Sequence, residues 1–323
     1  MLALALVVSL TAAAEGEALG PQQVYVGVYM HHVPEIDLKT STYLADFFIW
    51  FRWKGPHDPT QTLEWTNLAD ASALTRTFIF ADESGGSKPV ELPDGSLHQQ
   101  IHIQGRFTHP FSIERYPFDE QEIVFEIEDN QLQVGELVYV PDPVGKSALH
   151  PGFALAGWEV GDLTLAVSQA RYDTNFGDLR VKANEQTFAH LTAKLHVKRP
   201  IWSSLVKTIV PILIVLLITL VVFLIDGKYF DARMGLGITT LISAVALQLT
   251  SSASLPDVGY VVLLDKIYNV SYFIIFVALL ESVVAVRLVD QEQSARAQRI
   301  DRTTLALSLL LSLGAGVWLV LSR

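Results

Sequence analysis

The sequence contains no cysteine among its 323 residues. This absence excludes disulfide bonds, thiolate metal sites and cysteine nucleophiles, and it leaves the redox compartment open. Basic residues are also scarce, because 23 Lys and Arg stand against 34 Asp and Glu. A net charge of −11 argues against nucleic acid as a partner. The sequence further lacks a nucleophile elbow, a Walker loop, a dinucleotide fingerprint and a metalloprotease helix, so we expect neither an enzyme nor a cofactor.

The charges that are present are unevenly distributed along the chain. Residues 1–199 hold 26 acidic and 14 basic residues, a net of −12, together with all nine histidines. Residues 200–323 hold 8 acidic and 9 basic residues, a net of +1. An acidic first part is therefore joined to a very apolar second part, which argues against a simple soluble enzyme.

Four stretches of the second part are long enough to cross a bilayer. They cover residues 208–225, 234–255, 258–289 and 303–321. The first carries no charge, and at about 1.5 Å per residue its length is roughly 27 Å, close to a hydrocarbon core of about 30 Å. Because backbone groups in lipid must be satisfied internally, we expect a transmembrane domain over residues 200–323, with helices at about 201–225, 232–254, 258–289 and 301–321. The alternative is a set of buried helices in a large soluble core.

The placement of arginines predicts how the chain is oriented. Arg287, at the end of the third stretch, and Arg296, Arg299 and Arg302, between the third and fourth, make this connection positive, and positive loops stay in the cytoplasm. Residues 1–14 are typical of a secretory signal peptide. We therefore expect a multi-pass protein of the cell membrane, in contact with its lipids. Residues 15–199 would be extracellular or, in the inner membrane of a Gram-negative host, periplasmic.

The second apolar stretch is the least apolar of the four. It carries hydroxyls and one amide from Thr239, Thr240, Ser243, Gln248, Thr250, Ser251 and Ser252. Steps of three and four residues place one set of side chains on a single helix face. This set, called here the stripe, contains Asp231, Gly235, Thr239, Ile242, Ala246, Leu249 and Ala253. Composition alone leaves two interpretations open, a small-residue face that packs against other helices and a water-lined pore.

Residues 20–199 are typical of β-structure. Short segments rich in β-branched and aromatic residues recur along this region, and many of them alternate polar and apolar side chains. Turn sequences such as Lys54-Gly55-Pro56 and Pro93-Asp94-Gly95 separate them. This spacing predicts an immunoglobulin-like β-sandwich of about 180 residues.

Several motifs carry a resemblance to a known family. The loop HPFSIERYPFDEQ, from His109 to Gln121, has Tyr116-Pro117-Phe118-Asp119 at its core. It resembles the signature loop of the pentameric ligand-gated ion channels (the Cys-loop receptor superfamily). His109 and Ile123 occupy the two positions that a disulfide joins in animal members, and prokaryotic members lack that disulfide. The sequence ARMGLGITTLISAV, which starts at Ala232, is similar to the pore helix of the glycine and GABA receptor branch.

The resemblance implies a homopentamer in which five second helices surround one pore. Each residue of the stripe then becomes a ring of five, and Ile242, Ala246 and Leu249 form an apolar collar that can dewet. Asp231 forms an acidic ring at the cytoplasmic mouth, where anion channels of the family have Pro-Ala-Arg. We therefore expect permeation by monovalent cations such as Na⁺ and K⁺. An anion-selective channel of the same architecture is the alternative.

The resemblance also implies a region that couples the two domains. Arg199, in a Lys198-Arg199-Pro200 sequence that resembles the entry to the first membrane helix, is expected to pair with Asp119. The segment at residues 35–37 is expected to press on Pro256. The expected coupling residues are thus Glu35, Asp37, Tyr116, Pro117, Phe118, Asp119, Arg199 and Pro256. The alternative for the ion pair is an ordinary fold-stabilising role.

The agonist site of the family lies between subunits and is lined by aromatic side chains. The resemblance places Phe48, Glu128, Asp129, Asn130, Tyr172 and Phe176 in it. The segment that usually carries a central tryptophan reads Glu128-Asp129-Asn130-Gln131, so the aromatic cage is incomplete. A small-molecule agonist and protons both stay open, because histidines titrate near neutral pH. We expect no metal site, since His98 and His102 alone are too few ligands for zinc.

The leading hypothesis is therefore a ligand- or pH-gated pentameric cation channel of a bacterial envelope. A membrane-tethered sensor or binding protein is an alternative from another class, but the short segments 226–233 and 288–302 leave no cytoplasmic output domain. A membrane hydrolase is disfavoured because no set of nucleophile, base and orienting group can be assembled from the motifs.

Overall fold

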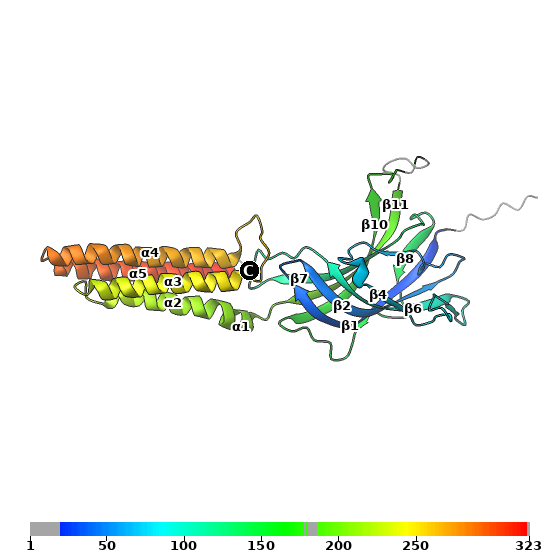
Figure 1. The fold of residues 1–323 in the computed structure, drawn as a ribbon, viewed down its shortest axis with the longest axis horizontal. Coiled ribbons are helices and arrows are strands. Elements are labelled where there is room, and N and C mark those ends of the chain that lie inside the picture. The colour runs from blue at the N-terminus through cyan, green and yellow to red at the C-terminus, as the bar shows by residue number, and fades with distance from the viewer. Residues whose placement is uncertain (1–19, 178, 180–185, 322–323) are drawn as a thin grey trace, which may run out of the picture.

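The computed structural model describes residues 20–177, 179 and 186–321, with side chains described up to residue 316. The expected signal peptide, residues 1–14, lies outside the described residues. The molecule is elongated, with β-strands at one end and long helices at the other (Figure 1).

The strands form two sheets. Within the described residues, the path of the first is β4 (Thr75–Phe78), β6 (Leu97–Thr108), β2 (Thr42–Trp53), β1 (Gln22–Asp37) and β8 (Leu137–Pro141), with β5 (Val90–Glu91) beside β6 and β9 (Ala148–Leu149) beside β1. The path of the second is β10 (Glu159–Tyr172), β11 (Gln186–Lys198), β7 (Glu120–Asp129) and β3 (Leu63–Trp65). A short 3₁₀ turn, η1 (Ala71–Ala73), precedes β4.

The two sheets share one aromatic core. Along β2, buried and half-buried residues alternate, because successive side chains of a strand point to opposite faces. This alternation turns Tyr43 and Phe47 inward, and the ring of Phe47 lies 4.5 Å from that of Phe125 on β7 of the other sheet. The hydroxyl of Tyr43 donates to the carbonyl of Val124. The prediction of a β-structured domain before the helices is confirmed.

Four long helical segments follow in the part of the chain that the structure describes. The first joins α1 (Ile201–Ser204), the π-helical turn η2 (Leu205–Ile209), α2 (Val210–Val221) and the 3₁₀ turn η3 (Val222–Leu224). The others are α3 (Phe230–Ser252), α4 (Leu263–Asp290) and α5 (Ser294–Leu321). Three of the described segments, residues 201–224, 230–252 and 263–290, are long and apolar enough to cross a membrane.

The starts of the last three helices differ from the predicted ones. α3 begins two residues early, at Phe230. α4 begins at Leu263 rather than near residue 258, because the N–H of Leu263 donates to the carbonyl of Glu114 (2.9 Å) and Val262 before it is extended. α5 begins at Ser294 rather than near residue 301. The predicted start was placed at the charge-free run. In the structure, α5 also includes the arginines before that run, Arg296, Arg299 and Arg302.

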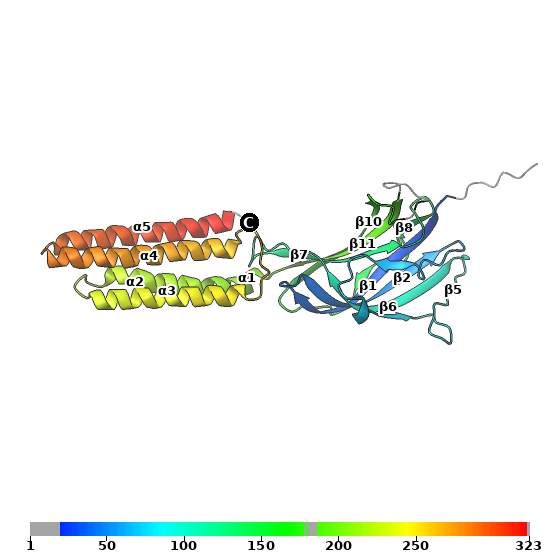
Figure 2. The same cartoon turned by 45° about the horizontal axis from the view of Figure 1, so that its top comes forward.

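The pore-helix candidate, α3, lies at one edge of the helical bundle. It packs against α2 and α4, and α5 packs against α4 at the opposite edge (Figure 2). This arrangement leaves one long face of α3 outside the bundle of a single chain.

Candidate functional site

The exposed face of α3 is the stripe. All seven predicted lining residues, Asp231, Gly235, Thr239, Ile242, Ala246, Leu249 and Ala253, are exposed in the single chain. The largest of them are far from buried, with Ile242 64% and Leu249 69% exposed. Thr239 donates its hydroxyl to the carbonyl of Gly235 in its own helix (2.7 Å), so this polar side chain needs no partner from a neighbouring helix. The stripe is therefore free to face water or another copy of the chain.

The opposite face of α3 is buried in the bundle. Its buried residues are Arg233, Gly237, Thr240 and Ala244. A Cβ at Gly237 would lie 2.5 Å from Cδ2 of Leu279 on α4, so glycine permits the close approach of the two helices. Within its own chain, α3 therefore packs through small residues that lie on the side away from the stripe.

Arg233 is the most polar member of that buried face. Its side chain has no exposed surface and donates to Glu281 on α4 (3.0 Å) and to Asp301 on α5 (2.8 Å). Because each residue turns a helix by about 100°, Asp231 lies about 200° away from Arg233 and faces the other side. Anchoring Arg233 inside the bundle therefore directs the carboxylate of Asp231 outward, along the stripe.

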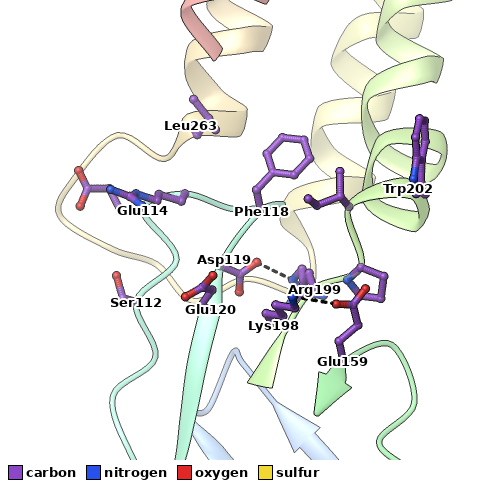
Figure 3. A pocket seen from close by; sticks show the side chains of 13 residues that line it. Ser112, Glu114, Phe118, Asp119, Glu120, Glu159, Lys198, Arg199, Trp202 and Leu263 are labelled. Carbon is purple, nitrogen blue, oxygen red and sulfur yellow. Dashed lines mark hydrogen bonds and ion pairs between the residues drawn. The ribbon is translucent and has the colours of Figure 1, made fainter. Parts of the chain in front are cut away.

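The domain junction contains the predicted ion pair. Nε of Arg199 lies 2.6 Å from Oδ1 of Asp119, whose side chain is 1% exposed (Figure 3). The guanidinium also lies over the rings of Trp158 (4.3 Å) and Tyr116 (5.0 Å). Gln121 donates to the second carboxylate oxygen of Asp119 (2.7 Å). Asp119 directly precedes β7, and Arg199 lies two residues before α1, so the pair holds the chain segment that connects the two domains.

A cavity of about 760 Å³ opens beside this pair (Figure 3). Phe118 of the signature loop, Trp202 at the start of the first helix and Leu263 at the start of α4 all line it. The signature loop is tied to the segment before α4, because the N–H of Ile113 donates to the hydroxyl of Tyr260 (3.3 Å). The loop that resembles the family signature therefore bridges the β-domain and two helices.

The β1–β2 turn approaches the same junction from the other sheet. Glu35 pairs with Arg106 of β6 (3.0 Å). Asp37 accepts the N–H of Lys39 (2.9 Å), and a hydrogen bond from the Thr40 side chain holds the pKa of Asp37 below its ordinary value. Both acids line a second cavity together with Ser254, Tyr116 and Arg199. Pro256, the expected contact of this turn, is half-buried two residues after Ser254.

Three of the predicted ligand residues come together on the second sheet. Glu128 on β7 accepts from the Tyr172 hydroxyl (2.8 Å) and lies 2.8 Å from Nδ1 of His190. The ring of Tyr172 lies 5.4 Å from that of Phe176, which is 68% exposed, and Asn130 is also exposed. The hydrogen bond with Glu128 raises the pKa of His190, while burial and the neighbouring Glu128 raise that of Tyr172 to about 12.

Of the other three predicted ligand residues, Asn130 is exposed next to Asp129, and Phe48 and Asp129 have partners elsewhere. Phe48 lies on the first sheet, where its ring stacks on His102 at 4.4 Å. Asp129 has no exposed surface and is engaged by His57 (2.8 Å), by the Thr62 hydroxyl and by the backbone N–H of Leu132 (2.7 Å). The carboxylate of Asp129 stabilises the turn after β7, where it accepts from the N–H groups of Gln131 and Leu132.

Metal ligation finds no support in this region. Among the described residues, no group of three or more His, Asp or Glu side chains is arranged to hold a metal ion.

The sequence is similar to proteins of known type. Residues 208–315 match the neurotransmitter-gated ion-channel transmembrane region. This match and the relatives below make the chain similar to the pentameric ligand-gated ion channels. Its relatives include a proton-gated ion channel of Gloeobacter violaceus, 23% identical over 293 residues that cover 88% of this chain and 78% of that protein. They also include a glutamate-gated chloride channel subunit beta of Haemonchus contortus, 24% identical over 284 residues, and a gamma-aminobutyric acid receptor subunit alpha-2 of Bos taurus, 21% identical over 272 residues.

The similarity to these relatives extends over most of this chain. The alignments with the last two relatives cover 82% and 80% of this chain but only 63% and 58% of the relatives' own length. The matched family model and these relatives are those of ion channels, and the chain has a β-domain followed by three described segments that are long and apolar enough to cross a membrane. The relatives include a channel named for protons and one named for chloride, so their names leave the permeating ion open.

Sequence reasoning missed the partners of Arg233. Glu281 was visible only as a charge inside an apolar stretch, and Asp301 only as the last acid before the final apolar run. Their sequence separations from Arg233 are 48 and 68 residues, so no local pattern connects them. The signal that was available is the rarity of charge inside membrane helices, because an intramembrane charge implies a partner.

Proposed function

We propose that the chain forms a homopentameric channel that conducts monovalent cations such as Na⁺ and K⁺ through a pore lined by α3. A small-molecule agonist or protons would open it. The observation that carries this proposal is the division of α3 into two faces. The stripe is exposed along the whole helix, whereas the opposite face is buried against the other helices of the same chain.

The composition of the stripe favours water on one side of α3 over lipid. Its cytoplasmic end carries Asp231, Gly235 and Thr239, and its outer half carries Ile242 and Leu249. A carboxylate in contact with lipid tails would be costly, whereas rings of acidic side chains are common in cation channels. The two exposed apolar residues would form the collar that stops ions when the pore is closed.

Charge at the cytoplasmic mouth supports cation selectivity. Asp231 is exposed, and the nearby positive charge of Arg233 is buried and paired with carboxylates. The net field that a permeating ion meets there would be negative, over a range of about one Debye length of 8 Å. The alternative is an anion-selective channel of the same architecture, which the chloride-channel relative keeps under consideration.

The placement of the ligand candidates supports a site between subunits. Tyr172 ends β10 of the second sheet, Phe176 lies in the turn that follows it, and Phe48 lies on the outer face of the first sheet, so these aromatics would meet only across a boundary between two copies. Proton control has its own support. His190 and Glu128 form a hydrogen-bonded pair, and one relative is named a proton-gated ion channel.

Reversal potentials in a salt gradient test the proposal. The full chain is expressed in oocytes, and bath pH and salt are stepped under voltage clamp. We expect the wild-type current to reverse near the equilibrium potential of the cation, and Asp231→Asn to move the reversal potential towards zero. Asp290→Asn is the matched control, because Asp290 is an exposed acid at the end of α4, away from the stripe.

Two results would count against the proposal. A reversal potential that follows chloride in the wild type would favour the anion-selective alternative. A purified complex that is a monomer or dimer, with no current at any pH or ligand, would favour the membrane-tethered sensor.

A further inference from the structure

A buried charge network lies at the end of the bundle where α3 begins. It contains Arg233 of α3, Glu281 of α4, Asp301 of α5 and the backbone carbonyl of Ile225. The three charged residues are 0%, 5% and 6% exposed. The network thus joins three helices and the turn before α3 within one chain, and it is independent of any contact between copies.

The guanidinium of Arg233 has no donor left over. Nε and one N–H of Nη2 donate to the carbonyl oxygen of Ile225. Nη1 donates to Glu281 (3.0 Å) and to Oδ1 of Asp301 (2.8 Å), and Nη2 donates to Oδ2 of Asp301 (2.9 Å). Since a guanidinium carries five N–H groups, every one of them is used. Asp301 is held in the two-point geometry typical of an ionised carboxylate with arginine.

Glu281 is left with an unsatisfied atom. Its Oε2 accepts from Arg233, but its Oε1 is buried without a hydrogen-bond partner. The carboxyl groups of Glu281 and Asp301 also lie close together, because the same atom, Nη1 of Arg233, donates to both of them. Two ionised carboxylates can only accept hydrogen bonds and would repel each other at this distance. One positive charge would also face two negative charges in a buried site, where uncompensated charge is costly.

One added proton would give Oε1 of Glu281 a hydrogen-bond partner and would also remove the excess negative charge of the two carboxylates. We propose that Glu281 and Asp301 bind one proton between them, carried by Oε1 of Glu281 and donated to Asp301. The network then contains one guanidinium, one carboxylate and one neutral carboxylic acid. The charged groups that face Glu281 are Arg233 from α3 and Asp301 from α5. From the turn before α3, the neutral carbonyl of Ile225 completes the site.

The proton site has a consequence for the helix that carries the stripe. Arg233 fixes the rotation of α3 about its axis only while its partners present the right acceptors. Removing the proton would add a second negative charge and leave Oε1 without a donor, so the acid pair would separate. The rotation of α3 at its cytoplasmic end is therefore linked to occupancy of this site by a proton.

Substitution by glutamine provides a discriminating variant. In Glu281→Gln, the side-chain carbonyl can accept from Arg233 and the amide can donate to Asp301, which reproduces the neutral acid and not the carboxylate. Glu292→Gln is the matched control, because Glu292 is exposed in the α4–α5 turn. Asp301→Asn removes the carboxylate that the two-point contact requires. All variants are made in the full chain.

Infrared difference spectroscopy of the purified protein at neutral pH measures the proton directly. Wild type minus Glu281→Gln should contain the carbonyl band of a protonated carboxylic acid, shifted in D₂O, whereas wild type minus Glu292→Gln should contain carboxylate bands only. The melting temperature of Glu281→Gln should stay within about 2 °C of the wild type, and that of Asp301→Asn should fall by more than about 5 °C.

Either of two results would overturn the inference. One is a Glu281→Gln difference spectrum that contains carboxylate bands alone. The other is a Glu281→Gln protein that melts as low as Asp301→Asn or does not assemble. Both readouts are independent of conduction, so they separate this inference from the proposed channel function.

Discussion

The ion pair at the domain junction allows a quantitative prediction. Asp119 is 1% exposed and Arg199 is 19% exposed at their side chains, and the two are joined at 2.6 Å. Removing one partner of a pair this deeply buried leaves the other charge without compensation, at a cost of about 3–5 kcal/mol. Asp119→Asn and Arg199→Gln should each therefore destabilise the β-domain by several kcal/mol, and the double variant should cost much less than their sum.

The assay is a double-mutant cycle on the free energy of unfolding. The solubilised full chain is unfolded in urea and followed by tryptophan fluorescence, to which Trp158 contributes because it lies 4.3 Å from the Arg199 guanidinium. We expect a coupling energy of about 2–3 kcal/mol, close to the upper end of values for residues in contact. This corresponds to a factor of roughly 30–160 in an equilibrium constant.

A second ion pair provides the control. Lys194 and Glu122 lie 2.9 Å apart on neighbouring strands, but their side chains are 41% and 43% exposed. Solvent screens such a pair, so its coupling energy should stay below about 1 kcal/mol. If the coupling energy of the junction pair is no larger than that of the control, burial does not govern its strength and the reasoning fails.

Three further predictions concern single positions. Ile242→Ala removes an exposed apolar side chain from the predicted collar and should shift activation to weaker stimuli, seen as a lower half-activating concentration or a smaller pH step; an unchanged activation curve would remove Ile242 from the gate. The raised pKa of His190 means that its contact with Glu128 stabilises the fold fully below about pH 6.5 and loses strength as pH rises through the raised value. His190→Gln should thus flatten the fall in melting temperature above that pH, and an unaltered pH profile would contradict this. Gly27→Ala places a Cβ 2.0 Å from the Trp50 ring and should destabilise the β-domain by about 1–3 kcal/mol in urea unfolding, whereas a neutral result would mean that Trp50 moves freely.

Features with a local period could be read from the sequence. The stripe on α3 follows from steps of three and four residues, and its seven members are all exposed in the structure. The alternation in β2 is similarly visible as Tyr43, Phe47 and Phe51 at even spacing. In both cases the side-chain period of a single element decides which face a residue occupies, so no knowledge of its neighbours is needed.

Features that depend on distant partners could not be read in this way. The position of Asp129 next to acidic Glu128 suggested one shared site, but adjacent strand residues point to opposite faces, so Glu128 meets His190 while Asp129 meets His57. The Asp119–Arg199 pair could be predicted, because the family resemblance supplied the contact. The partners of Arg233 had no such guide, since three separate helices must pack before the network forms.

The start of α4 shows the same limit on a smaller scale. Hydropathy continues through residues 258–262, yet the helix begins at Leu263 because its N–H bonds the carbonyl of Glu114 in the β-domain. A contact between domains therefore overrides the local apolar pattern.

The measurement that most directly tests a pore lined by α3 is a scan with single cysteines. The chain has no cysteine, so each introduced thiol is the only one in its subunit. Currents are recorded while a cationic thiol reagent is applied to the open channel. Thr239→Cys and Ala246→Cys, on the exposed stripe, should be blocked irreversibly, whereas Thr240→Cys and Ala244→Cys, on the buried face, should not. Block through the second pair and not the first would contradict the account.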